Sequence, residues 1–385
     1  MNEKDIVWKI PLFDLNFDVR EKNAVNRVLD RAWLTMGPEN IAFENKFSEF
    51  CGSPYCLSVN SCTAALHLAV VCSGIGPGDE VIVPSLTFVA TANAIRYAGA
   101  TPVFADVISA GIPLIDPESI VNVITPKTKA IIIVHYAGYP CDMDAILAIT
   151  KRYNLKLIED CAHSPGAKWK GKDTGTFGDF GCFSFFSNKN MSMGEGGAIT
   201  TNSEENFQKC KFMRSHGMTT LTLDRHKGHS YTYDVVAAGY NYRLDEMRAA
   251  IGLVQLEKLP QSNALRKDAI LYYRKALSGT PIEVPFVNYQ NACGVDHIMP
   301  VFLADGVIRE QVMAYMKSLG IQTSIHYPCI HQFTDFTGYS HTPLPVTENL
   351  SSRVLTLPLF PGLTSVQIDM VVDALLGGIH AQKNF

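Results

Sequence analysis

Short apolar runs alternate with stretches of helical spacing between about residues 60 and 200. Six runs are rich in β-branched and aromatic residues, as strands are, and lie near residues 81, 102, 129, 155, 182 and 197. Residues 63–72, 90–97, 143–153 and 244–259 carry apolar residues at helical spacing. Strands that alternate with helices are typical of a mainly parallel sheet covered by helices, so the pattern predicts an α/β fold.

The pattern changes after residues 258–268. A helix is followed by strand-like runs at 298–305 and 321–327, by loops over 327–361 and by a final helix over 365–379. This change predicts a large domain over residues 1–258, with the N-terminal segment, and a smaller C-terminal α+β domain over residues 259–385.

The composition of the chain limits the classes of partner that we expect it to bind. Hydrophobic residues make up 47% and charged residues 18% of the 385 positions, as in a compact globular protein. The net charge of -4, with basic residues spread along the chain, provides no basic face for nucleic acid and no polybasic tract for a membrane. The apolar runs are too short to span a bilayer, and the first residues, MNEKDIVWKI, lack the apolar core of a signal peptide. We therefore expect a cytoplasmic protein that binds small molecules.

The ten cysteines include no C-x-x-C pair, and several lie inside apolar runs. Free, buried thiols and no metal are the expectation, with a metal or cluster site as the alternative.

A lysine at the end of an apolar run is the first chemical signal. Lys189 lies in a polar turn after the run near 182 and is followed by Gly194, Gly196 and Gly197. Such glycines let a flat ligand approach the backbone. Partial burial would lower the pKa of the lysine and supply the neutral amine that reacts with carbonyl compounds. A surface lysine in a hairpin loop explains the segment equally well.

Three further positions suit a ring that carries a phosphate. Asp160 ends the run 155–160, where a carboxylate of a parallel sheet faces the ligand crevice and can pair with a protonated ring nitrogen. Cys62 and Thr63 open a helix whose free N–H groups can hold a phosphate, and Phe88 can stack on a ring. Ion pairing, helix capping and core packing, respectively, explain the same residues without a ligand.

These segments, in this order, closely resemble the DegT/DnrJ/EryC1/StrS family of pyridoxal-phosphate (PLP) dependent sugar aminotransferases. The resemblance begins at WLTMGP (33–38), includes NSCTAALHLA, LIEDCAHSPGA, SFFSNKNMSMGEGGAITT and GYNYRLDEMRAAIGLVQLEKL, and ends at LPLFPGLT. It covers nearly the whole chain. The resemblance implies the fold-type-I, aspartate aminotransferase-like architecture with a seven-stranded sheet. It also implies PLP as cofactor, with pyridoxamine phosphate (PMP) as its amino form, and transfer of an amino group to a keto-sugar.

Residue by residue, the resemblance implies that Lys189 forms a Schiff base with the cofactor and then moves protons between cofactor and substrate. Asp160 would pair with the pyridinium nitrogen, Phe88 would stack on the ring, and His163 would lie beside the ring oxygen.

The resemblance assigns the phosphate to Ser184, Thr63 and the amide of Cys62. In the family, the Asn of the GYNYR segment reaches the phosphate of the neighbouring subunit, so Asn241 implies a homodimer with shared active sites. Further candidates, for which ordinary loop or core roles stay open, are Arg243, His326, Tyr327 and His331.

Two positions bear on the reaction that the resemblance implies. Residues 61–63 read Ser-Cys-Thr, whereas many relatives have Ser-Gly-Thr and others Ser-Ala-Thr, so we expect an intact phosphate turn. A branch of the family has His at the catalytic position and removes a sugar hydroxyl, so Lys189 favours amine transfer. L-glutamate is the expected donor and a nucleotide-linked keto-sugar the expected acceptor, in amino-sugar, surface-polysaccharide or secondary-metabolite biosynthesis. The alternatives are a PLP-dependent sugar dehydratase, which is a lyase, and a non-enzymatic regulatory protein on the same fold.

Overall fold

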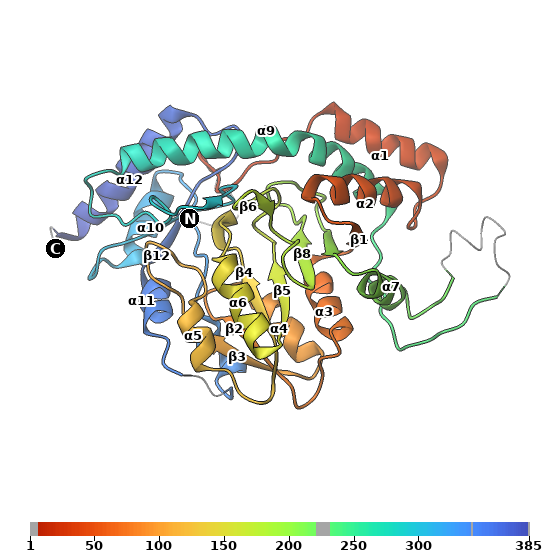
Figure 1. Ribbon diagram of the computed structural model, residues 1–385. Helices are drawn as coiled ribbons and strands as arrows, with labels where there is room; N and C mark the ends of the chain where they lie inside the picture. The colour runs from red at the N-terminus through yellow and green to blue at the C-terminus, as the bar shows by residue number, and fades with distance from the viewer. Residues whose placement is uncertain (1–6, 221–231, 340–341, 384–385) are drawn as a thin grey trace.

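A seven-stranded sheet forms the centre of the protein in a computed structural model that describes residues 7–220, 232–339 and 342–383 (Figure 1). The strand order is β1-β9-β8-β5-β4-β2-β3. β9 pairs antiparallel with β1 and β8, and the other neighbours pair in parallel. The predicted α/β fold is confirmed. The strands are β1 (Tyr55–Val59), β2 (Glu80–Pro84), β3 (Thr101–Ala105), β4 (Thr128–Val134), β5 (Lys156–Asp160), β8 (Phe180–Ser184) and β9 (Gly197–Thr201).

Helices cover both faces of this sheet because its strands are apolar on both sides. In β4, Ile132 packs into the core under α3 and α4, whereas Ile131 and Ile133 pack into the core under α5 and α6. This alternation follows from the two-residue period of a strand. The helices around the sheet are α3 (Cys62–Cys72), α4 (Val89–Tyr97), α5 (Pro117–Asn122), α6 (Met143–Tyr153) and α7 (Glu204–Met213).

The longest helix, α9 (Glu246–Ala276), has 31 residues and runs along the top of Figure 1. Helices α1 (Val19–Arg31) and α2 (Pro38–Cys51) pack along its first part, and α12 (Ser365–Lys383) packs against its second part. The expected helix end at residue 259 is wrong, since α9 continues through the exposed Pro260. Proline disfavours a helix interior, but here packing on both sides of it outweighs that cost. The expected domain boundary between 258 and 259 therefore lies inside a continuous helix.

The C-terminal part has its own apolar core, built from the second part of α9, a two-stranded antiparallel sheet and two helices, α10 (Arg309–Ser318) and α12 (Ser365–Lys383). Its elements are β11 (Met299–Phe302), α10 (Arg309–Ser318), α11 (Pro345–Arg353), β12 (Val354–Leu357) and α12 (Ser365–Lys383). Two sequence expectations are corrected. Residues 327–361 hold α11 and β12 rather than loops alone, and residues 321–327 form only isolated bridges at Ile321 and Ser324.

Short elements complete the described chain. A three-stranded sheet joins β10 (Ala292–Cys293), β6 (Lys168–Trp169) and β7 (Lys172–Asp173). Turns of 3-10 helix occur at η2 (Tyr136–Gly138), η3 (Ile330–Gln332) and η4 (Thr334–Phe336).

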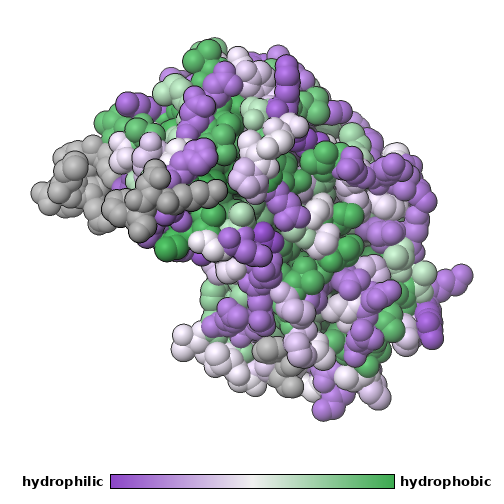
Figure 2. Space-filling view, turned by 90° about the vertical axis from the view of Figure 1, so that its left-hand side faces the viewer, coloured by the Kyte–Doolittle hydropathy of each residue, from purple (hydrophilic) through white to green (hydrophobic). Residues whose placement is uncertain are grey.

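The cysteines and the surface agree with the composition. All ten cysteines are free, and eight are buried. In the described part of the chain, no helix is both long and apolar enough to cross a membrane. Hydrophilic side chains interrupt the hydrophobic ones across the face shown in Figure 2.

Candidate active site

The carboxyl ends of four parallel strands open onto a cavity of about 360 Å³. Ligands of open α/β sheets bind at this edge, because the loops that follow the strands converge there. Most of the residues predicted from the sequence meet in this one place. They are Cys62, Thr63, Phe88, Asp160, His163, Ser184, Lys189, His326 and Tyr327.

Lys189 follows β8 and reaches the cavity wall. Its Nζ lies 3.4 Å from Nε2 of His297. Protein atoms surround the amine, and this burial lowers the pKa of Lys189 to about 8, although nearby Asp160 and Cys62 oppose the shift. An appreciable fraction of the amine is therefore neutral near neutral pH, as a nucleophile or a general base requires.

Asp160 is buried at the end of β5, and its two carboxylate oxygens are both engaged. Oδ2 accepts a hydrogen bond of 2.8 Å from the Thr91 hydroxyl, and Oδ1 accepts one of 3.1 Å from the amide of Ala162. Burial raises the pKa of Asp160, and these two hydrogen bonds oppose the rise. A buried carboxylate held by neutral donors would gain from a cationic partner in the cavity, such as a protonated ring nitrogen.

The turn before α3 forms another wall of the cavity. The Ser61 side chain caps the helix by accepting a hydrogen bond from the amide of Ala64, and the amides of Cys62 and Thr63 precede the first helical hydrogen bond. A Cβ atom on Gly197 would lie 2.5 Å from the carbonyl carbon of Ser61. Only glycine lets β9 pass so close to this turn. The capping interpretation is confirmed, and the cap leaves the first amides available to an anion.

Aromatic side chains also line the cavity, and they are held in different ways. Phe88 is 57% exposed and lines the cavity, so core packing does not explain it. Nδ1 of His163 accepts a hydrogen bond of 3.3 Å from the amide of Ala137, which leaves the ring proton on Nε2, 3.0 Å from the Tyr327 hydroxyl. Burial lowers the pKa of His163 well below its usual value, so the ring is neutral.

Three predicted residues lie outside this cavity. The placement of His331 at the site is wrong, because its ring is buried between Ser85 (2.7 Å) and Glu348 (3.2 Å). Asn241 is exposed beyond α7, and Arg243 lines a second cavity of about 190 Å³.

Sequence reasoning missed polar residues of the first cavity, among them Thr91, Asn188 and Glu195, and also His297, which contacts Lys189. Thr91 and Glu195 lie close in sequence to predicted residues, and Asn188 directly precedes Lys189, so proximity was an available signal. Oδ1 of Asn188 is buried and has no hydrogen-bond partner within the described residues. His297 gave no signal, because 108 residues separate it from Lys189.

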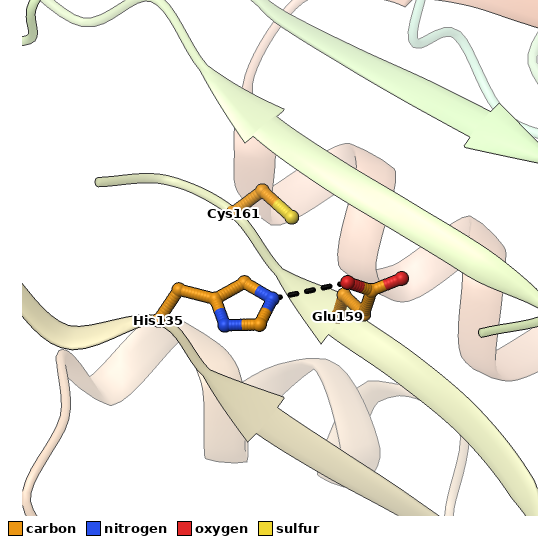
Figure 3. A group of neighbouring side chains, drawn as sticks. All are labelled: His135, Glu159 and Cys161. Atoms are coloured by element: carbon orange, nitrogen blue, oxygen red, sulfur yellow. Dashed lines mark hydrogen bonds and ion pairs between the residues drawn. The ribbon is translucent and has the colours of Figure 1, made fainter. Parts of the chain in front are cut away.

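Beside the site, His135, Glu159 and Cys161 form a buried group of the kind that can bind a metal (Figure 3). Their hydrogen bonds give a different explanation. Nδ1 of His135 accepts from the amide of Cys141 (3.1 Å), so its Nε2 donates to Glu159 (3.0 Å, the dashed line in Figure 3). Glu159 also accepts from the amides of 175, 177 and 178. Burial keeps the Cys161 thiol protonated by raising its pKa. The group therefore supports the turn after β7.

Comparison with known proteins decides the family. The sequence matches the DegT/DnrJ/EryC1/StrS aminotransferase family over residues 16–376. The chain belongs to this family. The structure is similar to S. venezuelae DesV in complex with a ketimine intermediate, with 33% identity, a TM-score of 0.88, and 97% of this chain and 99% of DesV covered.

Two further solved structures are similar to this chain to a comparable degree. The putative sugar aminotransferase Spr1654 of Streptococcus pneumoniae, in its PMP form, is 28% identical with a TM-score of 0.90, over 98% of this chain and 100% of Spr1654. DesI, solved in the presence of its TDP-sugar product, is 28% identical with a TM-score of 0.88, over 99% of this chain and 95% of DesI. The protein is thus a PLP-dependent sugar aminotransferase of fold type I.

The first cavity fits this cofactor. It combines a lysine of lowered pKa, a buried carboxylate, helix amides for a phosphate and an exposed aromatic ring. The set of functional groups that PLP needs is therefore present at one edge of the sheet.

Proposed function

We propose that the protein transfers an amino group from L-glutamate to a nucleotide-linked keto-sugar and that Lys189 is its catalytic base. The observation that carries this proposal is the pairing of Lys189 and Asp160 in one cavity, with the helix amides of Cys62 and Thr63 on its wall. Such a set serves a phosphate-bearing ring and a proton transfer together.

The proposed roles follow from the contacts. When bound, PLP carries the amino group and stores the electron pair released at the reacting carbon. Asp160, oriented by Thr91, would hold the ring nitrogen in its protonated form. Lys189 would take the proton from the donor carbon and then deliver it to the cofactor. Its pKa of about 8 permits both protonation states that this transfer needs.

We further propose that the active unit is a homodimer that shares its sites. We also propose that the second cavity holds the diphosphate of the nucleotide-sugar, because three buried donors that line it have no hydrogen-bond partner within the described residues. Lys211 adds another cation to its wall, and Glu44 already accepts from Arg214 (2.6 Å). An excess of donors suits the diphosphate of a nucleotide-sugar, and DesI was solved with a TDP-sugar. The three donors are Nε of Arg214, Oγ of Ser215 and Nη1 of Arg243.

Exposed apolar side chains that lie close in sequence to residues lining this cavity favour a partner subunit. Tyr233, Val235 and Val236 are each more than half exposed. Apolar groups clustered on a surface are typical of protein interfaces. In the proposed dimer, Asn241 would contact the cofactor phosphate of the neighbouring subunit.

Absorption spectra and product masses test the function. With PLP, the wild-type protein and the exposed-lysine control Lys151→Ala should show the visible band of a lysine-bound cofactor, and L-glutamate should shift it. Lys189→Ala should lack both the band and the activity. A band and full amine transfer in Lys189→Ala would refute the proposed role of Lys189.

A panel of keto-nucleotide-sugars with nitrogen-15-labelled L-glutamate then identifies the reaction. Incorporation of the label into a sugar supports the proposal. A product that has lost water without gaining the label would instead establish the dehydratase alternative.

A further inference from the structure

His297 contacts the amine of Lys189, yet none of the roles above uses it. Its Nε2 lies 3.4 Å from Lys189 Nζ, and its side chain is 3% exposed. The residue belongs to the segment that leads into β11, in the C-terminal part of the chain. A buried polar ring beside a reactive amine affects that amine through whichever of its nitrogens carries the proton.

The hydrogen bonds of Asn190 determine the protonation of this ring. Nδ2 of Asn190 donates to the carbonyl oxygen of Val295 (2.9 Å) and to Oδ1 of Asn263 (2.8 Å). Because a carbonyl oxygen can only accept, the amide orientation is fixed and its Oδ1 faces Nδ1 of His297 at 2.8 Å. Nδ1 must therefore carry the proton. Burial lowers the pKa of His297 well below its usual value, so Nε2 presents a lone pair to Lys189.

The backbone of His297 is fixed as firmly as its ring. Its amide donates to the carbonyl of Ala137 (2.9 Å), and its carbonyl accepts from Arg266 Nη1 (3.2 Å). Its ring packs against the ring of His163, with centroids 4.3 Å apart. The lone pair consequently has one direction, toward the lysine amine.

We propose that His297 is a positioning residue that accepts a hydrogen bond from the Lys189 amine whenever this amine is not bonded to the cofactor. The inference rests on the proposed role of Lys189. An acceptor stabilises an ammonium group more than an amine, so His297 opposes the effect of burial. It keeps the amine both oriented and able to hold the proton between its removal and its return.

Two substitutions separate this role from a structural one. In His297→Asn, the amide nitrogen replaces Nδ1 and can still donate to Asn190, but nothing replaces the acceptor at Nε2. In His297→Gln, the amide oxygen reaches the Nε2 position, while the donor to Asn190 is lost. His297→Gln should therefore lower the melting temperature more than His297→Asn does. His297→Asn should change the pKa of Lys189 more than His297→Gln does.

The experiment measures the pKa of Lys189 in the full-length holoenzyme. In the PMP form, each variant is acetylated with trace acetic anhydride across a pH series, and mass spectrometry compares Lys189 with the exposed Lys151. We expect the labelling midpoint of Lys189 to fall by about one pH unit in His297→Asn and to stay close to wild type in His297→Gln.

Each outcome bears on one proposal or on both. An unchanged midpoint in His297→Asn, or an equal fall in both variants, would overturn the role of His297. Labelling of wild-type Lys189 in the PLP form distinguishes failure of this inference from failure of the proposed function, since a lysine bonded to PLP is protected from acetylation. If Lys189 is labelled equally in the PLP and PMP forms, the proposed function fails and the inference fails with it.

Discussion

Gly197→Ala tests the close approach between β9 and the turn before α3. The added Cβ would lie 2.5 Å from the carbonyl carbon of Ser61 and 2.7 Å from the nitrogen of Cys62. Ordinary contact begins near 3.4 Å, so the two segments must separate by about 0.9 Å (3.4 minus 2.5). Gly197 is held between Val59 and Ser184 in the sheet, so the displacement falls on the turn.

The magnitude follows from the cost of overpacking, which is typically about 1–3 kcal/mol. If the turn takes up this strain, the affinity for PLP should fall roughly 5- to 140-fold, at about 1.4 kcal/mol for each factor of ten. Titration of the apoprotein with PLP, followed by absorbance, measures the change. Gly76→Ala is the matched control, since its Cβ would find no atom closer than 3.8 Å. If Gly197→Ala binds PLP as tightly as Gly76→Ala, the turn does not hold the phosphate.

Three other predictions address the neighbouring groups. Glu159→Gln should destabilise the fold by about 2–3 kcal/mol in chemical denaturation, because an amide donor would face backbone donors; a loss within error would contradict the supporting role of Glu159. The single-turnover rate from the PMP form should rise roughly tenfold per pH unit below about pH 8 and level off above it, since Lys189 acts as a neutral base; a pH-independent rate would exclude that base. Mixed and refolded Lys189→Ala and Asn241→Ala chains should regain roughly a quarter of wild-type activity, because half of the dimers contain one intact shared site; mere averaging of the two activities would exclude sharing.

The strand ends explain why much of the site could be predicted. Asp160 and Ser184 end parallel strands, and Phe88 and Lys189 follow such strands, so the fold alone brings them to one sheet edge. Local pattern could not reveal His297, whose contact with Lys189 depends on how the C-terminal part packs. His331 lies in the same segment of the sequence as His326, yet its ring is buried against Ser85 and Glu348 and lies outside the cavity.

Helix boundaries failed for a related reason. Pro260 is a strong local signal for a helix end, but α9 is stabilised on both sides of it by tertiary packing that no local pattern encodes. The short runs that became α11 and β12 lie among prolines and turn-forming residues, which hid them.

The unbroken α9 constrains how the enzyme can move. Two lobes joined by a flexible loop can rotate about it as a hinge when a substrate enters. Here the rotation would have to bend a helix of 31 residues whose first part lies on α1 and α2 and whose second part carries the C-terminal core. Because Arg266 on this helix also holds the carbonyl of His297, such bending would pull an acceptor away from Lys189. A continuous α9 therefore favours admission of a large sugar by movement of side chains that line the cavity, such as the exposed Phe88, over rotation of the two parts of the chain.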